Sequence, residues 1–411
     1  MHTQRVLSYG VLALPLSFAA LPIYVHVPRF YEQVTGMNLA VLGALLLAAR
    51  LLDAFTDPWL GWLADRFSRP RMIAWALLPF TAGFVALLNP ALGHPAFWLL
   101  GSLLLTYLGF SAATVAYQAH GAGLTEDPRM RTRLTAAREG FGLLGVLLAA
   151  ALPSLLASDP SVGTARLSWV LLVLLLPTAA WFFFQTQSSQ TNLGSTQVPQ
   201  APMWPSLKRV LNNPSFRRLL GVFLLSGIAS ALPATLFLFF VADVLGNEAA
   251  GGPLLGLYFL AGALSLPAWV ALAGGVGRVR AWLWAMGFSV VAFVGAGLLG
   301  AGDTAAFAVI CLLSGLALGA DLALPAAMAA DLGERQRLSG AIFGVWNFVA
   351  KLNLALAAGL ALPLLSLIAY APGSGEGLPA LRFAYAVLPL VFKTLAAALL
   401  WRWRHDLETP P

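Results

Sequence analysis

The stretch Leu46–Arg66, LLAARLLDAFTDPWLGWLADR, decides the fold, because it places two carboxylates inside an apolar run long enough to cross a bilayer. Asp53 and Asp57 lie four residues apart, so a helix presents both on one face, and Arg50 falls on the same stripe. Charges inside a membrane are costly and are kept mainly where they face a polar cavity. The stretch therefore predicts a membrane helix whose paired oxygens suit a small cation or a proton.

The composition of the whole chain agrees with a membrane protein. Of its 411 residues, 59% are hydrophobic and 10% are charged, and the mean hydropathy is +0.80. Soluble domains carry about 25% charged residues. The pI of about 9.9 follows from basic residues flanking the spans, the positive-inside rule, so no nucleic-acid partner is expected.

Continuous apolar runs predict twelve membrane-spanning helices, near 7–31, 38–64, 72–91, 96–121, 136–157, 165–185, 217–243, 252–275, 280–300, 304–330, 338–371 and 379–402. Most of the 24 lysines and arginines then collect on one side of the membrane, and only Arg29, Arg166 and Arg382 fall on the other. This asymmetry predicts that both termini are cytoplasmic.

A polar stretch over 186–216, rich in Gln, Ser, Thr and Pro, predicts a flexible cytoplasmic linker. It separates a six-helix half, 1–185, from a second half, 217–411. GWLADRFSRPR at 61–71 and GGVGRVR at 274–280 occupy the same place in each half and form a weak internal echo. The predicted fold class is an all-α membrane protein of twelve helices in two halves, which resembles the major facilitator superfamily.

The segment Gly61–Arg71 resembles the signature loop of that superfamily, G-x-x-x-D-R-x-x-R. The resemblance implies that Asp65 caps or pairs with a neighbouring helix end and that Arg66 and Arg69 hold a cytoplasmic gate. The alternative is that these arginines only set the topology.

The segment Arg50–Trp62 resembles the glycoside–pentoside–hexuronide:cation symporter family, with the pattern R-x-x-D-A-x-x-D-P-x-x-G-W. The resemblance implies that Asp53 and Asp57 are the metal or proton ligands, with a further oxygen from Thr56. Na⁺ or H⁺ would be the coupling ion, and no other cofactor is expected; hard cations prefer such oxygen ligands. The alternative is an Arg50–Asp53 pair that only ties helices together.

The same resemblance extends to a solute site. Arg138 matches a family arginine that borders the sugar pocket, Lys351 matches a lysine near the cation site, and Tyr117 matches an aromatic beside the sugar ring. Ser17 and Ala113 stand where the melibiose permease-like members carry sugar-binding aspartates, so a galactoside held in that way is not expected. The other cavity candidates are Ser111, Thr114, Gln118, Trp346 and Asn347.

Several intramembrane groups need partners. Lys351 is predicted to pair with Asp53 or Asp57, and Asp321 is either a second proton site or a partner of Lys351 or Arg138. Arg138 has the alternative of pairing with Glu139 or Asp53 as packing. Lys393 is expected to reach the membrane interface, and the sequence assigns no role to His26 or His120.

The leading hypothesis is cation-coupled symport of a sugar-like solute by a monomer in a bacterial cytoplasmic membrane, with membrane lipid as its surroundings. The alternative is transport of a lysolipid or another amphipathic solute, since both sugar-binding acids are missing. A third hypothesis, a membrane protein without transport, predicts tolerance of Asp57→Asn. No phosphate-binding loop, zinc spacing or nucleophile elbow occurs in the sequence, so an enzyme is not expected.

Overall fold

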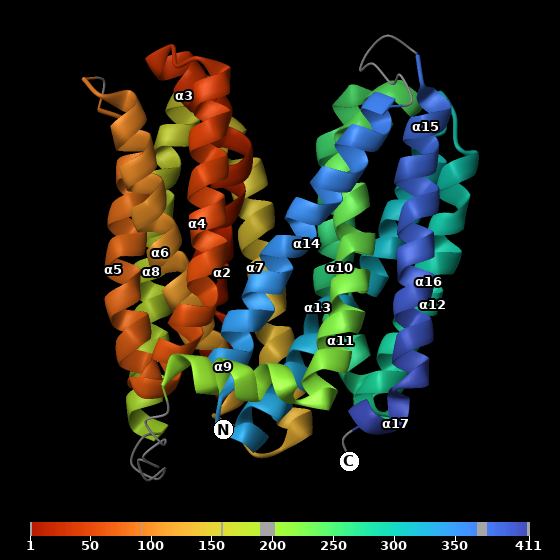
Figure 1. Cartoon of the computed structure of the whole chain (residues 1–411). Coiled ribbons are helices and arrows are strands. Elements are labelled where there is room, and N and C mark those ends of the chain that lie inside the picture. The colour runs from red at the N-terminus through yellow and green to blue at the C-terminus, as the bar shows by residue number, and fades with distance from the viewer. Residues whose placement is uncertain (1, 92, 158, 190–201, 368–375, 409–411) are drawn as a thin grey trace. The chain divides into compact units, whose positions relative to one another are not determined.

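The structure is a computed structural model that describes residues 2–91, 93–157, 159–189, 202–367 and 376–408. All regular elements in these ranges are helical (Figure 1). The chain divides into two compact units, Met1–Val210 with Ala330–Phe348, and Leu211–Ala329 with Val349–Pro411.

Eleven helices in the described residues are long and apolar enough to cross a membrane, so the multi-pass membrane protein is confirmed. The second predicted span, 38–64, is the 28-residue helix α4 (Leu39–Arg66), which is not among the eleven. Its length is sufficient, but it carries Arg50, Asp53 and Asp57 at its centre.

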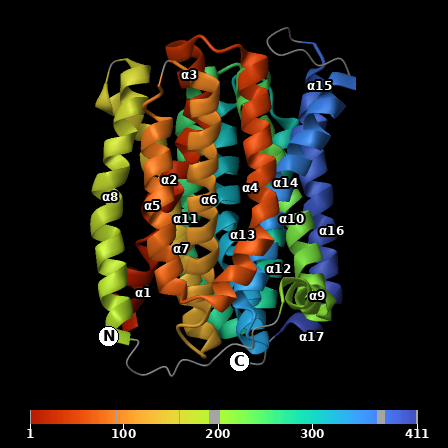
Figure 2. The same cartoon turned by 60° about the vertical axis from the view of Figure 1, so that its left-hand side comes forward.

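The first unit contains the helices α1 (His2–Gly10), α2 (Ala13–Leu21), η1 (Pro22–His26), α3 (Val27–Thr35), α4, α5 (Arg69–Leu87), α6 (Pro95–Ala122), α7 (Pro128–Leu156) and α8 (Pro160–Ser189), and most of α9 (Met203–Asn212). In both views α4, α5 and α6 lie side by side (Figures 1 and 2). Glycines allow such close contact: a Cβ built on Gly109 of α6 would lie 2.3 Å from the backbone nitrogen of Phe80 on α5.

The first predicted span, 7–31, is not one continuous helix. It is interrupted at Val11–Leu12, between α1 and α2. Pro15 has no N–H to donate to the carbonyl of Val11, and the amide of Leu14 bonds to that carbonyl instead, at 3.1 Å. The interruption therefore has a local cause that the sequence contains.

The second unit contains α10 (Pro214–Phe239), η3 (Phe240–Val244), η4 (Glu248–Ala250), α11 (Gly251–Val276), α12 (Arg278–Val294), η5 (Gly295–Leu298), most of α13 (Thr304–Gln336), the later part of α14 (Ser339–Leu367), α15 (Leu378–Arg382), η6 (Phe383–Val387), α16 (Leu388–Arg402) and α17 (Arg404–Leu407). Its core includes Phe240, whose ring stacks on Tyr385 with centroids 4.1 Å apart and lies 5.2 Å from Phe307. These aromatic contacts join η3, η6 and α13 in one apolar cluster.

The predicted linker, 186–216, contains the helix α9, which ends immediately before α10. Residues 190–201 of this linker, and the end of the predicted span 338–371 beyond Leu367, lie outside the described residues.

Candidate functional site

Helix α4 has its acids buried and its apolar side chains exposed. Asp53 is 6% exposed and Asp57 is 0% exposed, whereas Phe55 is 69% exposed and Trp59 is 44% exposed. This is the reverse of a helix on a soluble protein, and it is the arrangement expected where lipid surrounds the outer face. The i, i+4 spacing thus places both carboxylates inside the first unit.

Asp53 has a hydroxyl partner on α6. The Oγ of Ser111 donates a hydrogen bond of 2.6 Å to its Oδ1, and Ser111 is itself 2% exposed. The Thr56 hydroxyl donates to the main-chain oxygen of Asp53 at 2.8 Å, which leaves oxygen lone pairs near the acids. The sequence indicated Ser111 only as a cavity candidate, and the structure adds its bond to Asp53.

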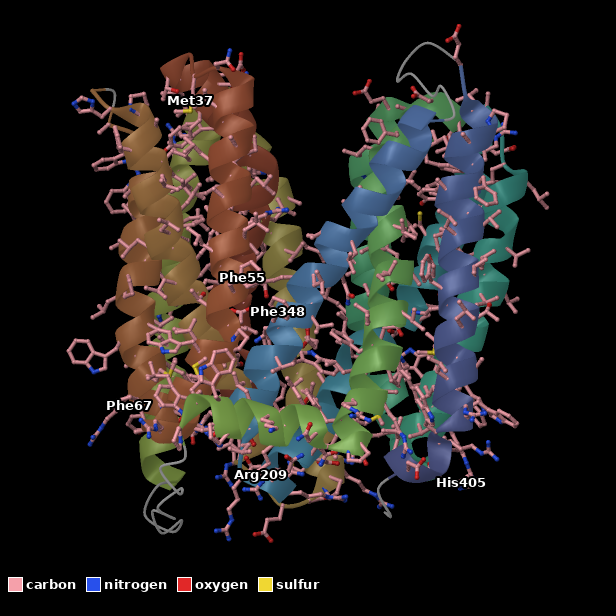
Figure 3. All side chains as sticks on the ribbon, viewed as in Figure 1. Met37, Phe55, Phe67, Arg209, Phe348 and His405 are labelled. Atoms are coloured by element: carbon pink, nitrogen blue, oxygen red, sulfur yellow. The ribbon has the colours of Figure 1, made fainter. Side chains whose placement is uncertain are left out.

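The backbone of α14 lies close to α4 beside these acids. A Cβ built on Gly344 would lie 2.6 Å from the main-chain oxygen of Asp57, and one built on Gly61 would lie 2.3 Å from that of Gly340. Phe55 and Phe348, labelled in Figure 3, have ring centroids 5.9 Å apart. The start of α14 therefore packs directly against α4 at Asp57 and Gly61.

The side chains around Asp53 and Asp57 that could bind a cation offer oxygen atoms as ligands. Among the described residues, no group of three or more His, Cys, Asp or Glu side chains could hold a metal ion. Two carboxylates with the hydroxyls of Thr56 and Ser111 do not resemble a zinc or iron site. Such a set fits a hard monovalent cation or a proton.

Two predicted solute residues meet directly. The Nδ2 of Asn347 on α14 donates a 2.8 Å hydrogen bond to Oε1 of Gln118 on α6. Trp346 next to it is 4% exposed. This amide pair offers further donors and acceptors to a hydroxyl-rich solute.

Tyr117 on α6 is buried against the end of α1. Its hydroxyl donates to the main-chain oxygens of Tyr9, a short contact, and of Gly10 at 3.3 Å, at the end of α1. The hydroxyl of Tyr9 donates in return to the oxygen of Tyr117 at 3.3 Å, and the two rings are 4.7 Å apart. These contacts explain its burial, and its predicted role beside a solute stays a prediction.

Arg138 pairs with Glu139 on α7, and its Nε donates to Oε1 of that residue at 3.1 Å. This is the alternative that the sequence left open for Arg138. Gly142 follows Arg138 by one helical turn on α7. A Cβ built on Gly142 would lie 2.9 Å from the Oγ of Ser17. Ser17 on α2 therefore contacts α7 one helical turn from Arg138.

Asp321 has a partner that the sequence did not indicate. Lys393 on α16 is 5% exposed and forms an ion pair with it, so the expectation that Lys393 reaches the interface is wrong. The indole N–H of Trp282 also donates to Asp321, at 2.8 Å, and Lys393 donates to the Ser226 hydroxyl at 3.0 Å. Four helices of the second unit, α10, α12, α13 and α16, therefore meet at one compensated pair of charges.

Lys351 belongs to the second unit, and its predicted pairing with Asp53 or Asp57 stays a prediction. Arg50 is exposed on α4. Among the described residues, the Nε2 atoms of His26 and His120 find no hydrogen-bond partner. The ring of His120 packs edge-on against Phe182, with centroids 5.6 Å apart.

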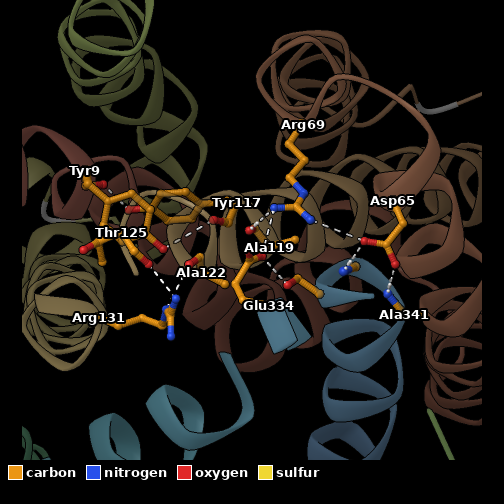
Figure 4. A network of polar contacts seen from close by, with 12 residues as sticks. Tyr9, Asp65, Arg69, Tyr117, Ala119, Ala122, Thr125, Arg131, Glu334 and Ala341 are labelled. Atoms are coloured by element: carbon orange, nitrogen blue, oxygen red, sulfur yellow. Dashed lines mark hydrogen bonds and ion pairs between the residues drawn. The ribbon is translucent and has the colours of Figure 1, made fainter. Parts of the chain in front are cut away.

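Asp65 accepts two hydrogen bonds from the start of α14, from the N–H groups of Gly340 at 2.6 Å and Ala341 at 2.8 Å (Figure 4). The first amides of a helix have no partner inside it, and an anion there interacts well with the helix dipole. Burial raises the pKa of Asp65, which lies just beyond the predicted span 38–64, while Arg69 and the two amides oppose this shift.

Two arginines complete this network. Arg69 contacts Asp65 at 3.5 Å and Glu334 at 3.4 Å, and donates to the oxygen of Ala119 at 2.8 Å. Arg131 pairs with Asp331 (Figure 4 draws its bonds to the chain around Ala122). Arg66 instead stacks on Trp62, 4.3 Å from its ring centre. Sequence reasoning missed Arg131, Asp331 and Glu334, although an acidic and basic run, DLGERQR at 331–337, marks this end of α13.

The chain matches a known protein family over almost its whole length. The sequence profile described as "MFS/sugar transport protein" matches residues 6–406. This chain belongs to that family. The prediction of an all-α membrane protein with the major facilitator fold is confirmed, with eleven candidate spans found among the described residues against the twelve predicted. The chain is also similar to a bacterial homologue of the iron transporter ferroportin in an outward-facing state, with a TM-score of 0.72 and 18% identity over 98% of this chain and 99% of that one. At this identity the likeness shows the fold alone.

Two of the chain's relatives carry names of transporters. The isoprimeverose transporter of Lactiplantibacillus pentosus is 27% identical over 50% of this chain, and the match spans 45% of that protein's length. YagG of Escherichia coli (strain K12), a candidate glycoside/cation symporter by name, is 26% identical over 88% of this chain and 83% of its own. The resemblance to the glycoside–pentoside–hexuronide:cation symporters is thereby confirmed.

Proposed function

We propose that the protein is a secondary transporter that couples uptake or release of a sugar-like solute to Na⁺ or H⁺. The observation that carries this proposal is the pair of buried carboxylates on α4, one of them bonded to Ser111, in a chain of a sugar transport family. Cation binding would neutralise the pair and raise the affinity for the solute, and by linkage the solute would raise the affinity for the cation equally. The two halves would then expose the loaded site to either side by alternating access.

The names of the relatives favour a glycoside over a lysolipid as the solute class. We place the protein as a monomer in a bacterial cytoplasmic membrane with both termini cytoplasmic, following the distribution of basic residues. Its partners there are membrane lipid and the solute, and it performs no catalysis.

The first test is the thermal stability of the purified protein against sugars, uronates and lysolipids, with and without Na⁺, over a range of pH. A ligand that binds the folded state raises the midpoint of unfolding. Na⁺ or a proton should stabilise the wild type and increase the effect of one solute. Asp57→Asn should lose the cation response, whereas Glu32→Gln, at an exposed position, should keep it.

The solute identified in this way is then supplied to proteoliposomes with an imposed Na⁺ or pH gradient. Uptake that follows the gradient in the wild type and is lost in Asp57→Asn supports symport. Uptake by Asp57→Asn at the wild-type rate and with the same gradient dependence would overturn the assignment of the acids.

A further inference from the structure

Helix α9 directly precedes a candidate membrane span in the chain. It ends at Asn212, and the candidate membrane span Pro214–Val244 begins two residues later. Within the first unit, which includes α9 up to Val210, α9 lies across the direction of the long helices α4, α5 and α6 (Figure 1), and Figure 2 looks nearly along its axis. A helix of ten residues is about 15 Å long, so all of α9 stays near the point where the chain enters this candidate span.

The two faces of α9 differ in composition. Ser206, Leu207 and Val210 are buried, at the i, i+1, i+4 spacing of one helix stripe. The other face is exposed and consists of Trp204, which is 75% exposed, Lys208, Arg209 and Leu211, which is 43% exposed. The helix contains no acidic residue, so neither cation has a partner of opposite charge within it.

We propose that this exposed face, Trp204, Lys208, Arg209 and Leu211, binds the anionic headgroups of the adjacent leaflet. Basic residues combined with a tryptophan and a leucine on one face are the composition of helices that lie in the interface. Anionic lipids attract such cations over about one Debye length, and the indole occupies the boundary between headgroups and acyl chains. The occupant is a lipid surface, because the next residues of the chain enter the bilayer.

The test uses the fact that the chain has one cysteine, Cys311. In a Cys311→Ser background, Trp204→Cys is labelled with a polarity-sensitive fluorophore, and the full-length protein is placed in nanodiscs of phosphatidylcholine with or without phosphatidylglycerol. The anionic lipid should shift the emission to the blue and lower quenching by an aqueous quencher several-fold. High salt should reverse both changes.

The double substitution Lys208→Gln and Arg209→Gln should abolish the difference between the two lipids. A label at Trp75→Cys on α5, 73% exposed within a candidate span, should be protected in both and controls for incorporation. Equal quenching at position 204 in the two lipids would overturn the proposal, as would a lipid difference that persists in the double variant. The readout is independent of transport, so it stands apart from the proposed function.

Discussion

At the scale of single residues, several charged side chains lie inside an otherwise apolar protein. Asp53 and Asp57 are buried on α4, and in the second unit the buried Lys393 pairs with Asp321, whose side chain is 14% exposed. Such groups persist only when hydrogen bonds or an opposite charge compensate for lost hydration. Their partners are therefore the positions where substitutions should have specific effects.

The bond from Ser111 to Asp53 should set the affinity of the cation site. A hydrogen bond to a charged group contributes about 1.5–3 kcal/mol, so Ser111→Ala should shift the cation concentration for half-maximal uptake by about tenfold or more. Ser102→Ala on the same helix is the matched control, since its buried hydroxyl donates to the main-chain oxygen of Leu99 at 3.1 Å. An unchanged cation dependence in Ser111→Ala would mean that the bond does not shape the site.

The pair Asp321–Lys393 should reveal its energy in a double-mutant cycle. Lys393→Met leaves the half-buried carboxylate of Asp321 without its cation, and the free energy of unfolding should fall by up to about 3–5 kcal/mol. Adding Asp321→Asn removes that charge while its oxygen still accepts from Trp282, so most of the loss should be recovered. If denaturant unfolding shows that the stability losses of Lys393→Met and Asp321→Asn simply add in the double variant, the two side chains do not stabilise each other.

At the scale of elements, neighbouring helices approach closely where glycines replace side chains. α5 and α6 meet at Gly83 and Gly109, and α7 meets α2 at Gly145, where a built Cβ would lie 2.2 Å from the oxygen of Leu14. In lipid there is little hydrophobic drive between helices, so close packing supplies much of their association.

Gly109→Ala should therefore separate α6 from α5. Its Cβ has no room beside Phe80, and overpacking of this kind costs about 1–3 kcal/mol. Gly101→Ala on the same helix meets nothing within 4 Å and should be neutral or slightly stabilising, because alanine favours helix over glycine. Thermal unfolding of the two variants side by side measures the difference, and similar midpoints would contradict close packing at Gly109.

At the scale of the whole molecule, α13 and α14 each pass from one compact unit to the other. Their joined ends, Ala330–Phe348, belong with the N-terminal helices. Asp65, Arg69 and Arg131 supply the polar contacts that hold this segment. Asp65 and Arg69 are among the residues in which the signature loop predicted a gate, whereas sequence reasoning missed Arg131, and the gate itself stays a prediction.

Asp65→Asn should loosen the start of α14, because an amide cannot accept both backbone N–H groups in the same geometry. In the Cys311→Ser background, a cysteine at Ile342, 0% exposed, should react with a thiol reagent several-fold faster when Asp65→Asn is present. A cysteine at the exposed position Arg335 should react at the same rate in both. Equal rates at Ile342 would show that Asp65 does not secure this end.

The sequence by itself determined the class of protein, the positions of nearly all spans and the family. Each of these depends on local composition: runs of about 20 apolar residues, glycines and prolines within them, and two acids one turn apart. The inward direction of Asp53 and Asp57 could also be predicted, since spacing along one helix fixes a shared face. The interruption of the first span at Val11–Leu12 also has a local cause, since Pro15 follows Val11 by only four residues.

Only the tertiary structure decided the partners. Lys393 meets Asp321 across 72 positions, Arg131 meets Asp331 across 200, and Arg69 meets Glu334 across 265. Periodicity says which face of a helix is polar, but it does not say which other helix that face will meet. That choice depends on the fit of many surfaces at once, with glycines setting how near each backbone comes, and it is made only when the helices pack together.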